Sequence, residues 1–141
     1  AFTTLAPDTG PGEPHPTAGA VAVGARPVLV AYNLWIDATV EDARRIASEI
    51  RGPALRALGL RVGDRYQVSM NLIDPKALGP AEAFDHVVAA ARAAGPDIVV
   101  TGAELVGLVP ESVLRAVPRP RWESLDLSAD RTIEARLPQG A

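Results

Sequence analysis

Apolar and polar residues alternate along the chain with the spacings of strands and helices. Residues 27 to 36 predict a first strand, and Val28 to Ala31 within it is apolar on both faces, as in the middle strand of a sheet. Thr39 then predicts a helix start, with Asp42 three residues later in a weak form of the capping box. The helix ends at Gly52, which a proline follows. The chain therefore begins its folded part with a strand and a helix.

A hairpin and a second helix come next. Arg56 to Val62 and Tyr66 to Ile73 alternate apolar and polar residues, and Gly63-Asp64 between them is typical of a short turn. Gly79-Pro80 predicts the start of a helix, which Gly95-Pro96 ends. The second unit is thus a strand pair followed by a helix.

A fourth strand completes the pattern. Residues 98 to 101 predict it, residues 105 to 109 continue in extended form, and Pro110 begins a short helix that runs to Val117. The order β-α-β-β-α-β is that of ferredoxin-like folds, in which two helices cover one face of an antiparallel sheet. We expect this α+β fold, with the short extra helix after it.

The two ends of the chain leave alternatives open. Residues 1 to 25 are dense in proline and glycine, which excludes a regular helix. The segment is either a linker or, because Ala18 to Val23 is apolar and able to pair as a short strand, a segment that lies on the domain. Residues 118 to 141 contain two short alternating apolar runs around Ser128 to Asp130. They predict either a C-terminal hairpin or a tail that orders only against a partner.

Composition narrows the function classes. The chain has 141 residues, of which 48% are hydrophobic, enough for one domain with a core. A formal net charge of −3 provides no basic surface for nucleic acid. Cysteine is absent, which excludes disulfides and thiolate nucleophiles and is compatible with the cytosol. Because no apolar run approaches the ~20 residues of a membrane span, we expect a cytoplasmic protein with neither nucleic acid nor membrane as partner.

Two histidines are the obvious acid–base candidates, because imidazole titrates near neutrality. His86 lies in the second predicted helix, one position off its apolar stripe, where a partly exposed structural role is the simpler interpretation. His15 stands between two prolines, which makes it the better candidate for a ligand contact. Metal binding needs about three or four convergent ligands, and since the sequence shows no such spacing, we expect no metal.

Four polar residues are set within otherwise apolar strands: Asn33, Gln67, Asn71 and Glu104. Buried amides and carboxylates cost on the order of 1 to 3 kcal/mol each when they are left unpaired. These residues therefore either bond to one another and to backbone at strand ends, or they bind a ligand, and the sequence favours neither. Cations that could meet a ligand carboxylate, but that are normally solvated, are Arg26, Arg56, Arg65 and Lys76.

Five blocks of sequence carry a family resemblance. They are Pro-His-Pro-Thr-Ala-Gly-Ala at 14 to 20, Val-Gly-Ala-Arg at 23 to 26, Leu-Val-Ala-Tyr-Asn at 29 to 33, Gln-Val-Ser-Met-Asn-Leu at 67 to 72, and Gly-Ala-Glu-Leu-Val-Gly-Leu-Val-Pro at 102 to 110. In order and spacing the chain resembles the formiminotransferase family, the glutamate formimidoyltransferases, and specifically their C-terminal subdomain. By this resemblance residues 1 to 25 are an inter-subdomain segment, 26 to 117 are the subdomain, and 118 to 141 are the hairpin or tail.

The resemblance implies two ferredoxin-like subdomains in tandem. Tetrahydrofolate lies between them as a substrate and accepts a formimino group on N5 from formiminoglutamate, a step of one-carbon metabolism and histidine degradation. The principal catalytic histidine is implied to belong to the N-terminal subdomain, which is absent from this chain, so neither His15 nor His86 inherits its role. The start at Ala1 and the position of the one methionine, Met70, inside a predicted strand agree with a piece of a longer protein.

We therefore expect the folate-facing half of a formiminotransferase-like enzyme, folded but inactive alone, whose ligands are folate and glutamate-type small molecules and whose partner is the N-terminal subdomain. The implied site combines the segment between the subdomains with polar strand residues and one arginine for a glutamate carboxylate. Its residues are Asp8, Thr9, Gly10, Pro11, Gly12, Glu13, Pro14, His15, Pro16, Thr17, Arg26, Asn33, Asn71 and Glu104. The alternative is a non-catalytic ferredoxin-like module for metabolite binding or assembly, including a homodimer, built on a flat apolar sheet face of residues such as Val28, Val30 and Val68.

Overall fold

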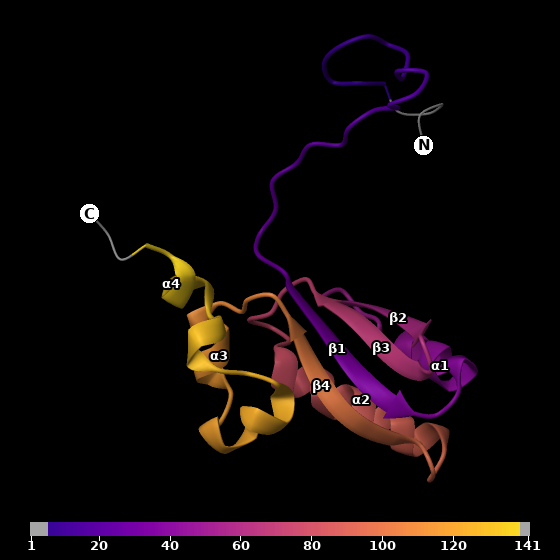
Figure 1. The fold of residues 1–141 in the computed structure, drawn as a ribbon, viewed down its shortest axis with the longest axis vertical. Coiled ribbons are helices and arrows are strands. Elements are labelled where there is room, and N and C mark those ends of the chain that lie inside the picture. Colours follow the sequence, from indigo (N-terminus) through magenta and orange to yellow (C-terminus); the bar gives the residue numbers. More distant parts are fainter. Residues whose placement is uncertain (1–5, 139–141) are drawn as a thin grey trace.

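The computed structural model describes residues 6–138. Its centre is an antiparallel four-stranded sheet with the strand order β2-β3-β1-β4. The strands are β1 (Val30–Asp37), β2 (Leu55–Val62), β3 (Arg65–Leu72) and β4 (Val99–Val106). The two main helices are α1 (Val40–Ile50) and α2 (Pro80–Ala94). Figure 1 shows both helices behind the sheet.

The connectivity is that of two interleaved β-α-β units. Strand β3 lies between β1 and β2, and β1 lies between β3 and β4, so each unit is split by one strand of the other. Helix α1 packs on β2 and β3, α2 packs mainly on β4, and the two helices pack on each other. The predicted ferredoxin-like α+β fold, with two helices on one face of an antiparallel sheet, is confirmed.

Local sequence signals explain how α1 is placed. The Thr39 hydroxyl accepts a hydrogen bond from the Asp42 backbone N–H at 3.1 Å, and the Asp42 carboxylate accepts one from the Thr39 N–H at 3.2 Å, so the predicted capping box is formed. The Thr39 hydroxyl also donates to the Asp42 carboxylate at 2.7 Å, and this bond, together with the one from the Thr39 N–H, holds the pKa of Asp42 below its usual value. On β2, a Cβ added at Gly59 would lie 2.2 Å from the carbonyl carbon of Ala43. Glycine at this position therefore lets α1 sit directly on the sheet.

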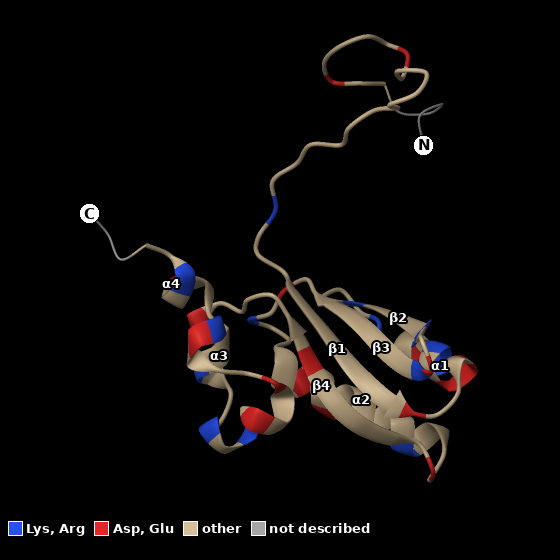
Figure 2. Cartoon of the chain, in the orientation of Figure 1, with Lys and Arg blue, Asp and Glu red and all other residues tan. Residues whose placement is uncertain are grey.

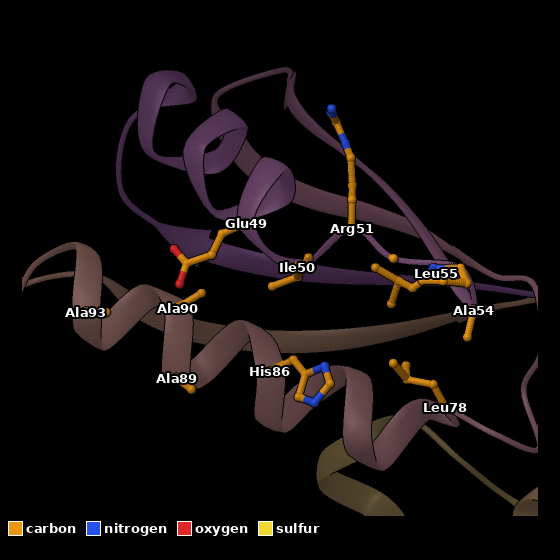
Figure 3. A pocket seen from close by; sticks show the side chains of 12 residues that line it. Glu49, Ile50, Arg51, Ala54, Leu55, Leu78, His86, Ala89, Ala90 and Ala93 are labelled. Carbon is orange, nitrogen blue, oxygen red and sulfur yellow. The ribbon is translucent and has the colours of Figure 1, made fainter.

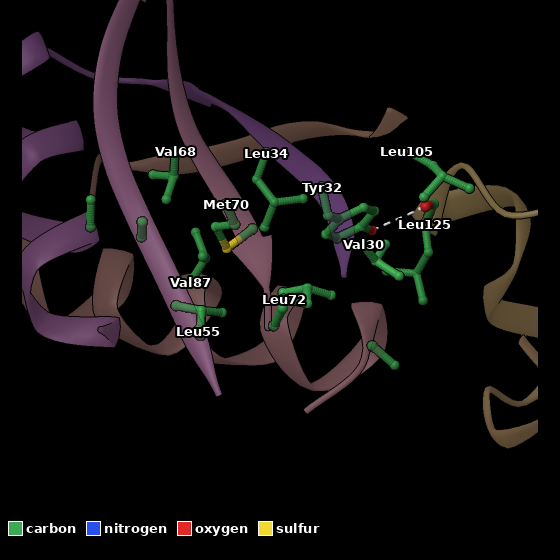
Figure 4. Packing of buried hydrophobic residues seen from close by; sticks show 14 of the residues in the cluster. Val30, Tyr32, Leu34, Leu55, Val68, Met70, Leu72, Val87, Leu105 and Leu125 are labelled. Atoms are coloured by element: carbon green, nitrogen blue, oxygen red, sulfur yellow. Dashed lines mark hydrogen bonds between the residues drawn. The ribbon is translucent and has the colours of Figure 1, made fainter. Parts of the chain in front are cut away.

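The helix-covered face of the sheet forms the core. Alternate residues of β1, among them Tyr32 and Leu34, are fully buried there (Figure 4). The Tyr32 hydroxyl donates to the backbone carbonyl of Leu125 at 3.0 Å, the dashed line in Figure 4. Burial, reinforced by nearby Asp126, raises the pKa of Tyr32 far above its ordinary value. This bond joins the central strand to the C-terminal part of the chain.

Residues 118–138 form neither of the expected structures. After α3 (Glu111–Ala116) come three 3₁₀ helices (Arg119–Arg121, Glu123–Leu125 and Ala129–Arg131) and the short helix α4 (Ile133–Arg136). The expected hairpin is absent from this region, and it is not a loose tail, because Leu125 and Leu127 are buried in the core. Leu125 and Leu127 are two residues apart, the spacing of a strand. Here a 3₁₀ helix ends at Leu125 and Asp126 has a left-handed backbone conformation, and together these direct both leucine side chains into the core. Residues 139–141 lie outside the described part of the chain.

Side chains of the C-terminal region close the end of β4. The Asp126 carboxylate accepts from the Leu105 N–H at 2.8 Å, and Arg131 bonds both this carboxylate, at 2.8 Å, and the Leu105 carbonyl. Exposed N–H and C=O groups on an edge strand are a template for unwanted pairing. The Asp126–Arg131 pair covers the backbone N–H and C=O groups of Leu105.

The fourth strand is continuous. The sequence pattern predicts two separate extended pieces, 98–101 and 105–109, whereas the structure has the single strand β4.

The N-terminal segment runs away from the domain. Residues 6–28 are exposed almost throughout and lead away from the sheet in Figure 1. The alternative that Ala18 to Val23 pairs as a short strand on the domain is wrong, because within residues 6–138 this stretch pairs only through an isolated bridge between Gly19 and His15 of the same segment. Its apolar side chains find no sheet edge within reach, since β1 begins only at Val30. In this structure the linker alternative therefore holds.

Candidate functional site

The face of the sheet away from the helices is uncovered within residues 6–138, and we call it the open face. In β1 it carries Ala31, Asn33 and Trp35, which are half-buried, while their neighbours in sequence are buried in the core. The strand register sets Asn33 beside Ser69 of β3 and Glu104 of β4. Paired residues of antiparallel strands share a face. Side chains from different strands thus meet in the middle of the open face.

Asn33, Gln67 and Glu104 form a hydrogen-bonded group there, which we call the Glu104 cluster. The side-chain amides of Asn33 and Gln67 each donate to Glu104 Oε2 at 3.2 Å. Gln67 is only 5% exposed, yet no buried side-chain nitrogen or oxygen in residues 6–138 lacks a partner. Three of the four polar residues that the sequence singled out, Asn33, Gln67 and Glu104, therefore bond to one another, and a role in ligand binding stays a prediction. Both bonds end on one carboxylate oxygen, and within the described residues Oε1 accepts none.

A β-bulge determines which residues of β4 join this face. The β1–β4 register shifts between Trp35 and Ile36, so that Gly102 is opposite Trp35 but Val100 is opposite Ile36. The extra residue, Thr101, changes the alternation of the strand. Glu104 and Val99 are five residues apart, which in a regular strand would put them on opposite faces, but the bulge brings them to the same face. Glu104 is the third residue from the end of β4, and Figure 2 shows acidic colour on that strand toward its arrowhead.

An aromatic ring and a cation lie next to the cluster. The indole Cδ1 of Trp35 lies 4.0 Å from the position that a Cβ on Gly102 would take, so the ring contacts β4 at its paired residue, two positions before Glu104. The guanidinium of Arg65 lies 4.0 Å from the centroid of the Trp35 ring. At this distance a cation is attracted to the face of an aromatic ring. Among residues 6–138 no carboxylate pairs with Arg65.

Exposed apolar side chains flank the polar centre on the open face. Strand β2 contributes Leu58, Leu60 and Val62 and strand β4 contributes Val99 and Val106, with Leu58 59% and Val99 53% exposed. Contiguous exposed apolar surface marks a place where another molecule or domain docks. The flat apolar face proposed from the sequence was wrong in its residues: Val30 and Val68 are buried beneath the helices, and Val28 precedes β1.

The structure gathers some of the predicted site residues and separates others. Asn33 and Glu104 are hydrogen-bonded, and Asn71 lies on the same face opposite Ala31, exposed and without a bond to the cluster. Residues 8–17 and Arg26 lie in the N-terminal segment, away from the sheet. Their role in binding stays a prediction.

Within that segment His15 organises a compact turn. His15 and Gly19 exchange two backbone hydrogen bonds of 2.9 and 2.8 Å. The His15 Nδ1 accepts from the backbone N–H groups of Thr17 and Ala18 at 3.3 and 3.2 Å. The His15 ring therefore fixes the backbone of the turn through Nδ1. Gly19 has φ +70°, a value that glycine adopts without strain.

His86 lies on the opposite side of the domain, in a groove between the helices. The groove has a volume of about 620 Å³ and runs between the end of α1 and α2, with His86, Glu49 and Arg51 at its margin (Figure 3). Its floor consists largely of alanines of α2, and His86 is exposed. None of these groups is buried and unpaired, so the groove offers less fixed polar geometry than the open face. In residues 6–138 no group of three or more His, Asp or Glu is placed to hold a metal ion.

The comparisons with known proteins agree with one another. The family described as "Formiminotransferase domain" matches residues 31–119, which is more than half of the chain. The chain belongs to the formiminotransferase domain family. It is similar to a glutamate formimidoyltransferase of Streptococcus pyogenes serotype M1, with 38% identity over 117 residues, covering 77% of this chain and 38% of the relative. It is also 34% identical over 143 residues to one of Thermoplasma acidophilum, covering 96% of this chain and 46% of the relative.

The chain corresponds to only part of its relatives. A formimidoyltransferase-cyclodeaminase of Dictyostelium discoideum is 38% identical over 125 residues, which are 78% of this chain but 23% of that protein. The chain thus spans less than half the length of each of these three relatives. The alignment with the Thermoplasma relative covers 96% of this chain and so extends beyond residues 31–119, which match the family, into most of the C-terminal region.

Sequence reasoning missed Trp35 as a member of the site and left Arg65 among solvated cations. A signal for Trp35 was present: it lies two residues after Asn33 in the same strand, and residues two apart in a strand point to the same face of the sheet. The ring's neighbour Gly102 follows from the β1–β4 register, which no local pattern in the sequence marks. Arg65 precedes Tyr66, which pairs with Ile36, so its position over the indole follows from the β1–β3 register.

The lengths and polarity of the helices bear on whether the chain contains a membrane-spanning segment. Across residues 6–138 every helix is too short, or too polar, to traverse a lipid bilayer.

Proposed function

We propose that this formiminotransferase chain is the folate-binding half of an enzyme that moves a formimino group from formiminoglutamate to tetrahydrofolate. In this reaction N5 of tetrahydrofolate attacks the formimino carbon, the bond from that carbon to the glutamate nitrogen breaks, and a proton passes from N5 to the departing amine. A histidine of the N-terminal subdomain handles the proton. The present chain supplies one wall of the cleft and positions the substrates.

The open face is the observation that carries this proposal. A hydrogen-bonded carboxylate with an unengaged oxygen lies at its centre, and exposed apolar side chains lie on both sides. Positioning of reactants by fixed polar groups supplies a large share of catalysis in group transfer. A face of this kind, left uncovered in a chain that spans 38% to 46% of two glutamate formimidoyltransferases, fits one half of a two-lobed site.

The N-terminal segment completes the proposed cleft. Residues 8–17 connect the two subdomains and line the folate site when the N-terminal subdomain is present to hold them. Their extended course here, with the internal turn at His15 and Gly19, gives them the length to reach between two lobes. Arg26, near the base of the segment, is positioned to meet a glutamate carboxylate. The enzyme works in the cytoplasm.

A chimaera tests the function. The matched part of the Streptococcus pyogenes relative is replaced by this chain, and formimino transfer and tetrahydrofolate binding are measured for the chimaera and for the 141-residue chain alone. We expect transfer and tight binding by the chimaera, and no transfer with much weaker binding by the chain alone. Equal binding by both proteins, or a folded chimaera that neither binds nor transfers, would contradict the proposal.

The second candidate function is that of an assembly module, which the five exposed apolar residues on β2 and β4 favour. Such a chain pairs its open face with a second copy. Sedimentation velocity of the 141-residue chain separates the two functions. A dimer that Leu58→Asp and Val106→Asp dissociate favours assembly, whereas a monomer that binds folate only in the chimaera favours the transferase half.

A further inference from the structure

The N-terminal segment contains an apolar stretch that nothing in the described part of the chain covers. In residues 20–24, which we call the valine stretch, the side chains of Val21 and Val23 are 86% and 93% exposed, the two highest values among the large apolar side chains of residues 6–138. No charged residue occurs from position 16 to position 25. Alternating, β-branched and uncharged residues favour a strand, and a strand needs a neighbour with which to pair. The valine stretch therefore lacks a partner strand.

One edge of the sheet lacks a partner along part of its length. Among the described strands β4 pairs only with β1, so its other edge faces outward. The N–H and C=O of Leu105 point to that side, because Asp126 and Arg131 bind them there. Backbone groups two residues apart in a strand point the same way, so those of Ala103 also point outward, and no hydrogen bond within residues 6–138 reaches them. Since residues 101–103 have small side chains, another backbone can approach this edge closely.

The opposite edge of the sheet, that of β2, is better protected. The Ala57 carbonyl accepts a hydrogen bond from Arg51 Nε at 2.8 Å. Gly59 is buried, and the backbone of α1 lies where its Cβ would be. Natural sheets cover or charge their edges in this way to prevent pairing with other chains. Residues 99–103 of β4 carry neither charge nor proline, so they form the edge that is open to strand addition.

The valine stretch does not reach this edge within its own chain. It joins the sheet at the start of β1, where Ala31 pairs with Val106, the last residue of β4. To lie beside Ala103 it would have to turn back past Val106 and cross the Asp126–Arg131 pair. In Figure 1 the segment instead leads away from the sheet. Residues 25–29 span about 17 Å when extended, which is enough to carry the valine stretch to the β4 edge of a neighbouring molecule.

We propose that two copies of this chain exchange their valine stretches, each adding residues 20–24 as a strand beside residues 99–103 of the other copy. The exchange is symmetric, so it closes at a dimer and does not grow into a fibre. Main-chain hydrogen bonds supply the attachment, as in other cases of strand addition, and Val21 and Val23 lose contact with water. The open face takes no part in this contact. The dimer thus goes beyond the proposed function, is compatible with it, and differs from a dimer formed through the open face.

Sedimentation velocity of the 141-residue chain at several concentrations measures the association, and we expect a reversible monomer–dimer equilibrium. Val21→Pro and Ala22→Pro each remove one backbone donor. Since alternate residues point to the partner strand, one of the two variants is expected to raise the dimer dissociation constant by about tenfold or more. Neither should lower the unfolding temperature of the dilute monomer, because the valine stretch has no hydrogen bond to the domain. Ala6→Pro, in the same exposed segment, is the matched control and should leave the equilibrium unchanged.

Disulfide trapping tests which elements meet, because the chain has no cysteine of its own. Val21→Cys chains are mixed with Thr101→Cys chains and oxidised, and a covalent heterodimer, identified by mass, is expected. When Val62→Cys on the β2 edge takes the place of Thr101→Cys, we expect no heterodimer above background.

Three outcomes would overturn the exchange. They are a monomer at every concentration, a dimer that Leu58→Asp dissociates but the proline variants do not, and a double variant, Val21→Cys with Thr101→Cys, whose disulfide closes within one chain. The chimaera, and not these variants, decides formimino transfer, so the two proposals fail separately.

Discussion

The two faces of one sheet differ in almost everything except their backbone. In β1, Tyr32 and Leu34 point to the helices and are fully buried, while Asn33 and Trp35 point the other way and are half-exposed. The helix face is apolar and is filled by α1, α2 and the C-terminal region. The open face has a hydrogen-bonded polar centre and apolar margins. One face holds the fold together, and the other is left for something that this chain does not contain.

This division explains why polar residues within the strands do not destabilise the domain. On the helix face an unpaired amide would cost on the order of 1 to 3 kcal/mol, and none is found there among residues 6–138. On the open face Asn33, Gln67 and Glu104 satisfy one another. The amide and carboxylate side chains of this cluster therefore lie on the face that another molecule can reach.

The largest contrast should come from leucines of equal size on the two faces. Leu34→Ala removes a fully buried side chain and is expected to cost about 2 to 5 kcal/mol of unfolding free energy, as in other large-to-small core substitutions. Leu58→Ala, on the open face and 59% exposed, should change it by less than about 0.5 kcal/mol. Urea unfolding of the 141-residue chain measures both. Similar costs would mean that the faces are equally important for folding.

A glycine substitution tests the contact between α1 and the sheet. Gly59→Ala places a Cβ 2.2 Å from the backbone of Ala43, so α1 must shift, and we expect a loss of about 1 to 3 kcal/mol. Gly24→Ala adds the same methyl group where nothing lies within 4 Å and serves as the control. Denaturation midpoints compare the two. An unchanged midpoint for Gly59→Ala would show that α1 does not pack as closely as described.

Tyr32→Phe tests the link from the core to the C-terminal region. The variant loses the hydrogen bond to the Leu125 carbonyl, at an expected cost of about 1 kcal/mol near neutral pH. Because burial raises the pKa of Tyr32, the folded state keeps its proton at pH values where the unfolded state, titrating near its ordinary pKa of about 10, has lost it. Stability should therefore fall as pH rises above about 10, and less steeply in Tyr32→Phe. Parallel slopes for the two proteins would contradict a buried phenol.

The smallest effect on folding is expected at the Glu104 cluster. Glu104→Gln keeps the shape of the side chain and an acceptor oxygen for Asn33 and Gln67, so we expect a stability change below about 1 kcal/mol. Its effect should be on binding instead. Thermal unfolding of this variant, set beside ligand titration of the chimaera, separates the two. A loss comparable to that of Leu34→Ala would assign the cluster to the fold and not to the site.

The sequence predicted the fold because its signals are local. The capping pair Thr39 and Asp42, the turn at Gly63-Asp64 and the helix start at Gly79-Pro80 each act within a few residues, and all three are where they were expected. The C-terminal region was misjudged because the partners of Leu125 and Asp126 are Tyr32 and Leu105, far away in sequence. Contacts of this kind have no local pattern.

The candidate site was predictable only in part, for the same reason. Asn33, Gln67 and Glu104 were conspicuous as polar residues in apolar strands, but that all three meet at one oxygen depends on the register of three strands. Trp35 and Arg65 come together through the pairing of β1 with β3, which no local pattern specifies. Residues 8–17 were singled out by resemblance alone, and their place in the site depends on a subdomain outside this chain.

The most direct measurement of the open face is by NMR. The ¹⁵N-labelled chain is combined with the unlabelled N-terminal part of the Streptococcus pyogenes relative, and tetrahydrofolate is added. The side-chain signals of Asn33 and Gln67 and the indole N–H of Trp35 should shift, while the indole N–H of Trp122, which donates to the Val117 carbonyl on the helix side, should not. Shifts confined to Trp122 and the helices, or no shifts at saturating ligand, would contradict the assignment of the open face as the ligand wall.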